Sequence, residues 1–248
     1  MINDFIELLK SKLHIFLGLL WGLAISVYLL KFIIPEWDRF TRFGKLESKN
    51  SWTFFPSIPN KIGWIIFYSF SCIMFFCTFL IKFPPMFQNY LLFIHSSRRF
   101  VECFVITKFS KRKMHLVNLL AGLCFYFITP ITLAYCVPQT KFIFVFITIA
   151  IILNILQSYV HYTISSLEKY SIPYGFLFNR ITSPHYLLEI LLYFVYFLSC
   201  PHILTFLMLF FVCLNLSHQA KMTYDWYCNK FGIEFLMLKR YVLIPYIF

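Results

Sequence analysis

A histidine and a glutamate one helical turn apart are the residues of this sequence best suited to chemistry. They are His185 and Glu189, in a stretch that begins at Ser183 and Pro184 and reads SPHYLLEILLY. Serine followed by proline is typical of the start of a helix, and positions i and i+4 lie on one helix face. A carboxylate one turn inside so apolar a helix is costly unless it binds a partner. We therefore expect His185 and Glu189 to bind a polar ligand.

A second set of polar residues recurs at helical spacing in the stretch HSSRRFVE. His95, Arg98, Arg99 and Glu102 stand at positions 0, +3, +4 and +7, so they share one stripe of a helix. Four polar groups on one stripe of a membrane helix are not expected to face lipid. Two interpretations are open: an internal ion-pair network that joins Arg98 to Glu102, or a pocket wall that binds an anion or another polar ligand.

Two further polar groups lie near the ends of apolar segments. Gln157 and His161 share a helix face shortly before the loop that leads to Pro184. Asn215, His218 and Gln219 end a later apolar segment and either bind a ligand or cap a helix. The eight cysteines form no CxxC pair and most lie inside apolar segments, so we expect no metal site.

The elements that must position these residues are membrane-spanning helices. The chain of 248 residues is 60% hydrophobic and 13% charged, with a mean hydropathy of +0.74, which is typical of a multi-pass membrane protein. We expect a single domain over residues 1–248, an all-α polytopic bundle of about seven transmembrane helices. The predicted spans are Leu13–Pro35, Ile62–Phe83, Gln88–Lys108, His115–Val137, Phe142–Ile164, His185–Ser199 and Ile203–Ser217.

The basic residues predict the orientation of these helices. Loops on one side hold 16 lysines and arginines and loops on the other side hold 4, so the positive-inside rule predicts a cytosolic C-terminus. Topology thus explains the net charge of +12, and we expect no nucleic-acid partner.

His161 comes late in an inward-running span, whereas His185 and Glu189 come early in an outward-running one. The polar groups should therefore converge in a cavity open to the cytosol, suited to a charged ligand and a partner dissolved in lipid.

Several of these motifs resemble those of a known enzyme family. The stretches IPYGFLFNRITSPHYLLEI and KRYVLIPYIF are similar to signatures of the steroid 5α-reductase family. HSSRRFVECFV, GLCFY and the run from Gln157 to His161 resemble the polyprenol (polyprenal) reductase branch, and IPNKIGWIIFY matches that branch less closely. The resemblance extends from about residue 61 to residue 248.

The resemblance implies a seven-helix membrane reductase of the endoplasmic reticulum that uses NADPH. Glu189 is expected to accept a hydrogen bond from the nicotinamide carboxamide, and Lys113 and Arg240 are expected to bind the phosphates. The other residues that it assigns to the cofactor are Gln157, His161, Tyr170, His185 and Tyr227. It also implies a polyisoprenoid lipid substrate, in dolichol synthesis for protein N-glycosylation, and no protein partner is indicated.

Chemistry narrows the substrate further. Hydride adds to an alkene only where negative charge can be spread, which an α,β-unsaturated aldehyde allows and an isolated allylic alcohol does not. We therefore expect polyprenal to be the species reduced, with a donor at its carbonyl oxygen and a proton for its α-carbon. His95 is the predicted oxygen donor, with Arg99 or Glu102 setting its protonation. In the steroid enzymes a tyrosine bonds the substrate carbonyl, and Ser96 stands at that position here, which argues against a steroid.

Three other functions are compatible with the sequence. A steroid 4-dehydrogenase or enoyl reductase of the same superfamily would share the cofactor but not the substrate. A membrane isoprenylcysteine or phospholipid methyltransferase would bind S-adenosylmethionine, although such enzymes usually carry an Arg-His-Pro sequence where this chain has Thr182-Ser183-Pro184. A non-catalytic lipid-binding or scaffold protein would tolerate alanine at His185 and Glu189.

Overall fold

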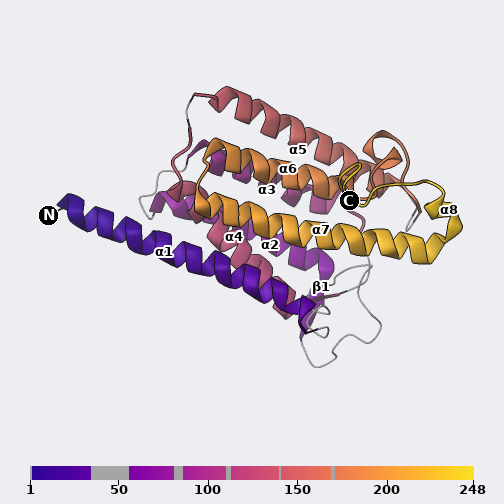
Figure 1. Ribbon diagram of the computed structural model, residues 1–248, viewed down its shortest axis with the longest axis horizontal. Helices are drawn as coiled ribbons and strands as arrows, with labels where there is room; N and C mark the ends of the chain where they lie inside the picture. The colour runs from indigo at the N-terminus through magenta and orange to yellow at the C-terminus, as the bar shows by residue number, and fades with distance from the viewer. Residues whose placement is uncertain (1, 35–55, 81–85, 110–112, 140, 169–170) are drawn as a thin grey trace.

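Seven long helices lie side by side in the computed structural model (Figure 1), which describes residues 2–34, 56–80, 86–109, 113–139, 141–168 and 171–248. The all-α polytopic membrane bundle predicted from the sequence is confirmed. The helices are α1 (Ile2–Leu29), α2 (Asn60–Leu80), α3 (Phe87–Val105), α4 (Leu116–Tyr135), α5 (Ile143–Ser166), α6 (Pro184–Ser199) and α7 (Ile203–Phe231).

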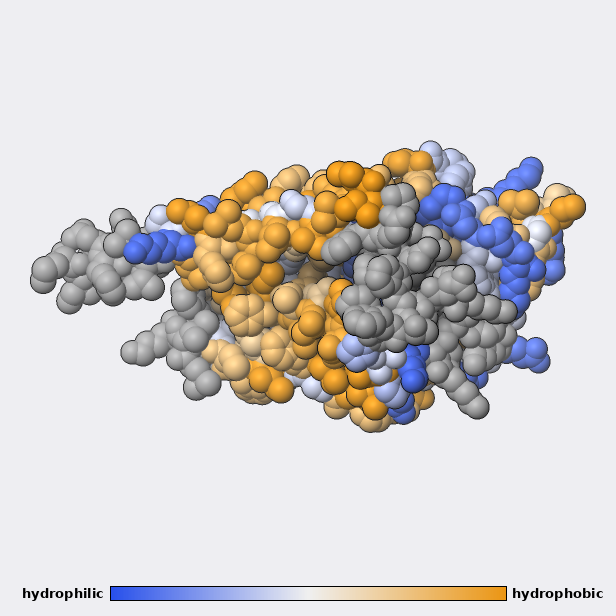
Figure 2. Space-filling view, turned by 90° about the horizontal axis from the view of Figure 1, so that it is seen from below, coloured by the Kyte–Doolittle hydropathy of each residue, from blue (hydrophilic) through white to orange (hydrophobic). Residues whose placement is uncertain are grey.

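Five segments of the described chain are long and apolar enough to cross a membrane, in α1, α2, α4, α5 and α7. Helix α6 is apolar but has only 16 residues. Helix α3 carries Arg98, Arg99 and Glu102, and it contacts α2, α4 and α5 within the bundle. The outer surface is rich in exposed apolar side chains such as Leu19 and Phe144. On the face in Figure 2 these form a broad band, with hydrophilic residues gathered mainly beyond one end of it, as expected for a bundle solvated by lipid.

Helix α7 is longer than the sequence pattern predicted. The expected span ended at Ser217, but the helix continues to Phe231 and is followed by the short helix α8 (Ile233–Leu236). The polar residues after Ser217 mark the end of the apolar stretch but not of the helix, because neither proline nor glycine occurs before Gly232. Gly232 has a φ of 54°, a conformation that glycine adopts easily and that ends helices.

The bundle end where α7 terminates is held by contacts between distant segments. Strands β1 (Ser57–Pro59) and β2 (Lys113–His115) pair antiparallel and join the starts of α2 and α4. The C-terminal segment is fixed to the loop before α6, since Tyr241 N donates to Arg180 O and Thr182 N donates to Tyr241 O, both at 2.9 Å. These contacts set the position at which α6 begins, and with it the position of Glu189.

Ser183 and Pro184 start α6 as predicted. Ser183 is the residue before the helix and Pro184 occupies its first turn, but the Ser183 hydroxyl caps no backbone N–H. The preceding loop contains the 3-10 helix η4 (Phe176–Asn179), whose entry requires Gly175 at a φ of 87°. Glycine accepts this value without a Cβ clash, so the IPYG turn directs the chain into α6.

Candidate functional site

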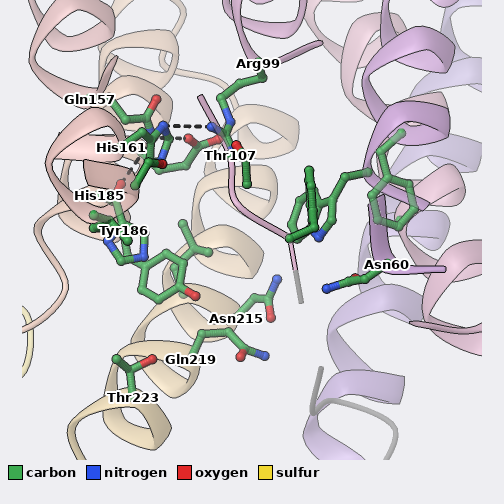
Figure 3. A pocket seen from close by; sticks show the side chains of 18 of the residues that line it. Asn60, Arg99, Thr107, Gln157, His161, His185, Tyr186, Asn215, Gln219 and Thr223 are labelled. Carbon is green, nitrogen blue, oxygen red and sulfur yellow. Dashed lines mark hydrogen bonds between the residues drawn. The ribbon is translucent and has the colours of Figure 1, made fainter. Parts of the chain in front are cut away.

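A cavity of about 700 Å³ opens among the helices at this end of the bundle, a volume within the range of small-molecule and cofactor sites. Its wall is formed by the late residues of α1, α3, α5 and α7 and the early residues of α2, α4 and α6. Figure 3 shows Arg99 pointing toward His161, with His185 and Tyr186 beside them and Asn215, Gln219 and Thr223 following along α7. The predicted convergence of polar groups at one depth is confirmed.

Glu189 is the centre of the polar wall. Its Oε1 lies 3.2 Å from His95 Nε2, and its Oε2 accepts a hydrogen bond from Gln157 Nε2 at 2.5 Å. A carboxylate only accepts hydrogen bonds, so His95 carries a hydrogen on Nε2. His95 Nδ1 in turn lies 3.1 Å from Asn154 Oδ1. Two donors therefore fix the Glu189 carboxylate at the cavity wall, and both are themselves held in place.

Glu102 is the centre of a second network directly behind this wall. Its carboxylate accepts hydrogen bonds from Arg98, from Arg99 and, at 2.7 Å, from Ser158 Oγ, and it lies 2.8 Å from His161 Nδ1. The ion-pair interpretation of the HSSRRFVE stripe is therefore correct for Arg98 and Glu102. The pocket-wall interpretation is correct for Arg99, which also lines the cavity. The two arginines balance Glu102 and Glu189, so the buried charges are compensated.

Another part of the cavity wall is aromatic. Helix α2 contributes Phe67 and Tyr68, helix α4 contributes Tyr126, and helix α6 contributes Tyr193. The close approach of α2 and α4 depends on Gly122, because a Cβ there would lie 2.3 Å from Cε1 of Phe67. The cavity wall thus combines charged and aromatic side chains, which suits a ligand pair in which one partner is polar and the other is hydrocarbon.

Six of the predicted site residues line this cavity. They are Arg99, Gln157, His161, His185, Glu189 and Tyr227. His95 and Glu102 do not line it: His95 is only 1% exposed and lies behind Glu189, and Glu102 lies behind Arg99. The geometry therefore makes His95 a positioning residue for Glu189 and does not favour it as the donor to a substrate oxygen.

The predicted phosphate-binding residues lie outside the cavity wall. Lys113 is exposed in β2, whereas Lys108 reaches the cavity. Arg240 is 6% exposed, its guanidinium lies 5.0 Å from the ring centre of Tyr174, and its Nε and Nη1 have no hydrogen-bond partner among the described residues. Burial lowers the pKa of Arg240, although Tyr174 and Tyr227 oppose this. Tyr170 lies outside the described residues.

Several cavity residues were not predicted from the sequence. Tyr68 and Tyr126 end the stretches IPNKIGWIIFY and GLCFY, so the paired aromatic residues of those motifs were the available signal. Asn60 lines the cavity at the start of α2, is 7% exposed, and its Oδ1 has no partner within the described part of the chain. A buried amide oxygen without a donor indicates a position that a ligand can satisfy.

Residues 115–248 match the protein family described as 3-oxo-5-alpha-steroid 4-dehydrogenase. The chain belongs to this family. The match covers Glu189 and the C-terminal segment that fixes the start of its helix, whereas Asn60, Tyr68 and Arg99 of the cavity wall lie before it.

Curated relatives of the chain carry the name polyprenal reductase. The Saccharomyces cerevisiae protein is 29% identical over 256 residues, with 97% of each chain covered. The Xenopus tropicalis protein is 28% identical over 184 residues, covering 64% of this chain and 59% of the relative. Polyprenal reductase 2 of Oryza sativa subsp. japonica is 27% identical over 208 residues, covering 65% and 58%. The chain thus spans less than two thirds of the frog and rice proteins. The predicted family is confirmed, and the names of these relatives agree with the predicted branch.

Proposed function

We propose that this chain is an NADPH-dependent reductase that saturates the α-isoprene double bond of polyprenal, the step that leads to dolichol for protein N-glycosylation. In this proposal residues 1–248 act as one membrane-embedded domain of the endoplasmic reticulum, with the cavity and the C-terminus facing the cytosol. One observation carries the proposal: a single cavity joins a charged wall built around Glu189 to an aromatic wall, inside a bundle whose exterior is apolar.

The polar residues of the cavity fit the nicotinamide cofactor. Glu189 has lone pairs for the carboxamide NH₂ beyond those that bind His95 and Gln157. The unpartnered Asn60 Oδ1 suits an amine or hydroxyl donor, and the unpartnered guanidinium nitrogens of Arg240, which lies outside the cavity wall, suit a phosphate that extends beyond it. When bound, NADPH supplies a hydride. These residues bind and orient it, and the apolar helices shield the reacting carbons from bulk water.

The aromatic wall fits the first isoprene units of a lipid. A tail that remains in the bilayer gains almost nothing on binding, although burying a CH₂ from water is worth about 0.8 kcal/mol. Recognition should therefore depend on the units next to the aldehyde and little on total chain length. The position of the carbonyl-binding tyrosine of the steroid enzymes is Ser96, which is fully buried and pairs with Ser71 at an Oγ–Oγ distance of 2.7 Å. Ser96 is therefore not placed to bind a substrate carbonyl, as the tyrosine of the steroid enzymes does.

Substrate competition with the purified protein tests this proposal. The protein in lipid nanodiscs would be given NADPH with polyprenal, polyprenol or a 4-en-3-one steroid, and products would be resolved by mass spectrometry. We expect a mass increase of two hydrogens for polyprenal, none for polyprenol, and a much slower reaction with the steroid. Faster reduction of the steroid than of polyprenal would indicate a 3-oxo-5-alpha-steroid 4-dehydrogenase, the activity after which the family is named. Consumption of S-adenosylmethionine in place of NADPH would indicate a methyltransferase.

A further inference from the structure

Tyr68 combines three features that the oxygen-binding residue of this site requires. It lies on α2 at the cavity wall, and it is only 3% exposed. Arg99 Nε donates a hydrogen bond to its hydroxyl oxygen at 3.1 Å, and the Arg99 guanidinium carbon lies 5.2 Å from the centre of its ring. Among the residues that the structure describes, none accepts a hydrogen bond from Tyr68. Its O–H is therefore available to a ligand in the cavity.

The position of Arg99 gives this hydroxyl its chemical character. A cation that donates to a phenol oxygen draws electron density from it and strengthens the hydrogen bond that the O–H can make. Arg99 is fixed from behind by Glu102, which is itself held by Ser158 and lies against His161. The Trp64 ring, tilted 23° to that of Tyr68 with ring centres 5.8 Å apart, restricts the phenol further. The donor is thus preorganised in a site with little water.

Three other candidate donors are less suitable. Tyr28 donates to backbone oxygens of α7, at 3.3 Å to Leu214 and 3.4 Å to Asn215. Ser96 does not reach the cavity. His95, which the sequence suggested for this role, donates to Glu189 behind the wall.

We propose that Tyr68 donates the hydrogen bond that stabilises the carbonyl oxygen of the α,β-unsaturated aldehyde during reduction, an inference that rests on the proposed function. A C–H bond of the dihydronicotinamide breaks and a C–H bond forms at the β-carbon. The α,β double bond moves to give an enolate, whose oxygen accepts the Tyr68 O–H. The α-carbon then takes one proton from a water molecule in the cavity, the hydroxide left behind takes a proton from solvent, and the C=O bond is restored. The products are the saturated aldehyde and the oxidised nicotinamide, and Tyr68 ends in its starting state.

The substitution Tyr68→Phe tests this role, with Tyr196→Phe as the matched control. Tyr196 is also a fully buried tyrosine, but it does not line the cavity and its hydroxyl has no partner among the described residues. Loss of one donor of this kind typically lowers kcat by about 10²–10³-fold, so we expect that loss in Tyr68→Phe with an unchanged KM for NADPH. The control should keep kcat within about threefold.

A binding measurement without turnover separates this role from the proposed function. A polyprenoic acid, whose carboxylate imitates the enolate oxygen, would be titrated in the presence of NADP⁺. We expect at least tenfold weaker binding to Tyr68→Phe than to the wild-type protein and no change in Tyr196→Phe. A wild-type protein that binds the acid but reduces no polyprenal would contradict only the proposed function. Equal binding of the acid by both proteins, no binding by the wild type, or a loss of NADPH binding in Tyr68→Phe would overturn the role of Tyr68.

Discussion

Replacement of Glu189 by glutamine should weaken NADPH binding strongly while leaving the bundle folded. In the wild-type site two donors point at the carboxylate, His95 Nε2 at 3.2 Å and Gln157 Nε2 at 2.5 Å. The amide in Glu189→Gln offers one acceptor oxygen, so one of the two donors would face an NH₂ group. The negative charge that binds the carboxamide in the proposed function is also lost.

The size of the loss in NADPH affinity follows from the free energy of a hydrogen bond to a charged group. Such a bond contributes about 1.5–3 kcal/mol, and 1.4 kcal/mol corresponds to a factor of ten in affinity. Loss of one bond to the cofactor therefore predicts a rise of roughly 10- to 150-fold in the dissociation constant for NADPH. Because the side chain keeps its shape, we expect the bundle to stay folded, with a melting temperature lowered by the one buried donor that loses its acceptor.

Calorimetric titration with NADPH measures the dissociation constant, and a melting curve measures the melting temperature. Asp225→Asn is the matched control, because it removes one acidic charge from α7 at a half-exposed position that pairs with Lys221 and does not line the cavity. It should bind NADPH as the wild type does. If Glu189→Gln binds NADPH within twofold of the wild type, Glu189 does not contact the cofactor and the site assignment fails.

Three further predictions concern the supporting residues and the orientation. Gly122→Ala should push Phe67 into the cavity, raise the KM for polyprenal and cost about 1–3 kcal/mol of stability by overpacking, with Gly22→Ala as the control because no atom lies within 4 Å of its added Cβ. His95→Ala should weaken NADPH binding with kcat little changed at saturating NADPH, because one donor to Glu189 is lost. A fall in kcat alone would restore His95 as the oxygen donor. A glycosylation acceptor fused after residue 248 should stay unmodified in microsomes, and its modification would place the cavity in the lumen.

The sequence was sufficient to predict the bundle and the depth of the site. Helical spacing placed His185 and Glu189 on one face, and the alternation of span directions predicted that they would meet His161. Both predictions depend only on helix geometry and on the cost of burying charge.

The sequence could not show which polar residues face the cavity and which lie behind them. His95 and Glu189 are both suited to catalysis by type, but α3 and α6 approach so closely that His95 contacts the hidden side of the carboxylate. The importance of Tyr68 depends on a contact with Arg99, which lies on another helix. Likewise, the end of α7 was placed too early, because polar composition marks the end of an apolar stretch and not the end of a helix.

The most direct test of the central claim is the position of the transferred hydrogen. The purified protein would be given polyprenal and NADPH that carries deuterium at the reactive C4 position, and the product would be analysed by mass spectrometry and NMR. The proposed function predicts one deuterium at the β-carbon of the first isoprene unit and a saturated α,β bond. Deuterium on the aldehyde carbon, which would indicate reduction to the alcohol, or a product without deuterium, would contradict it.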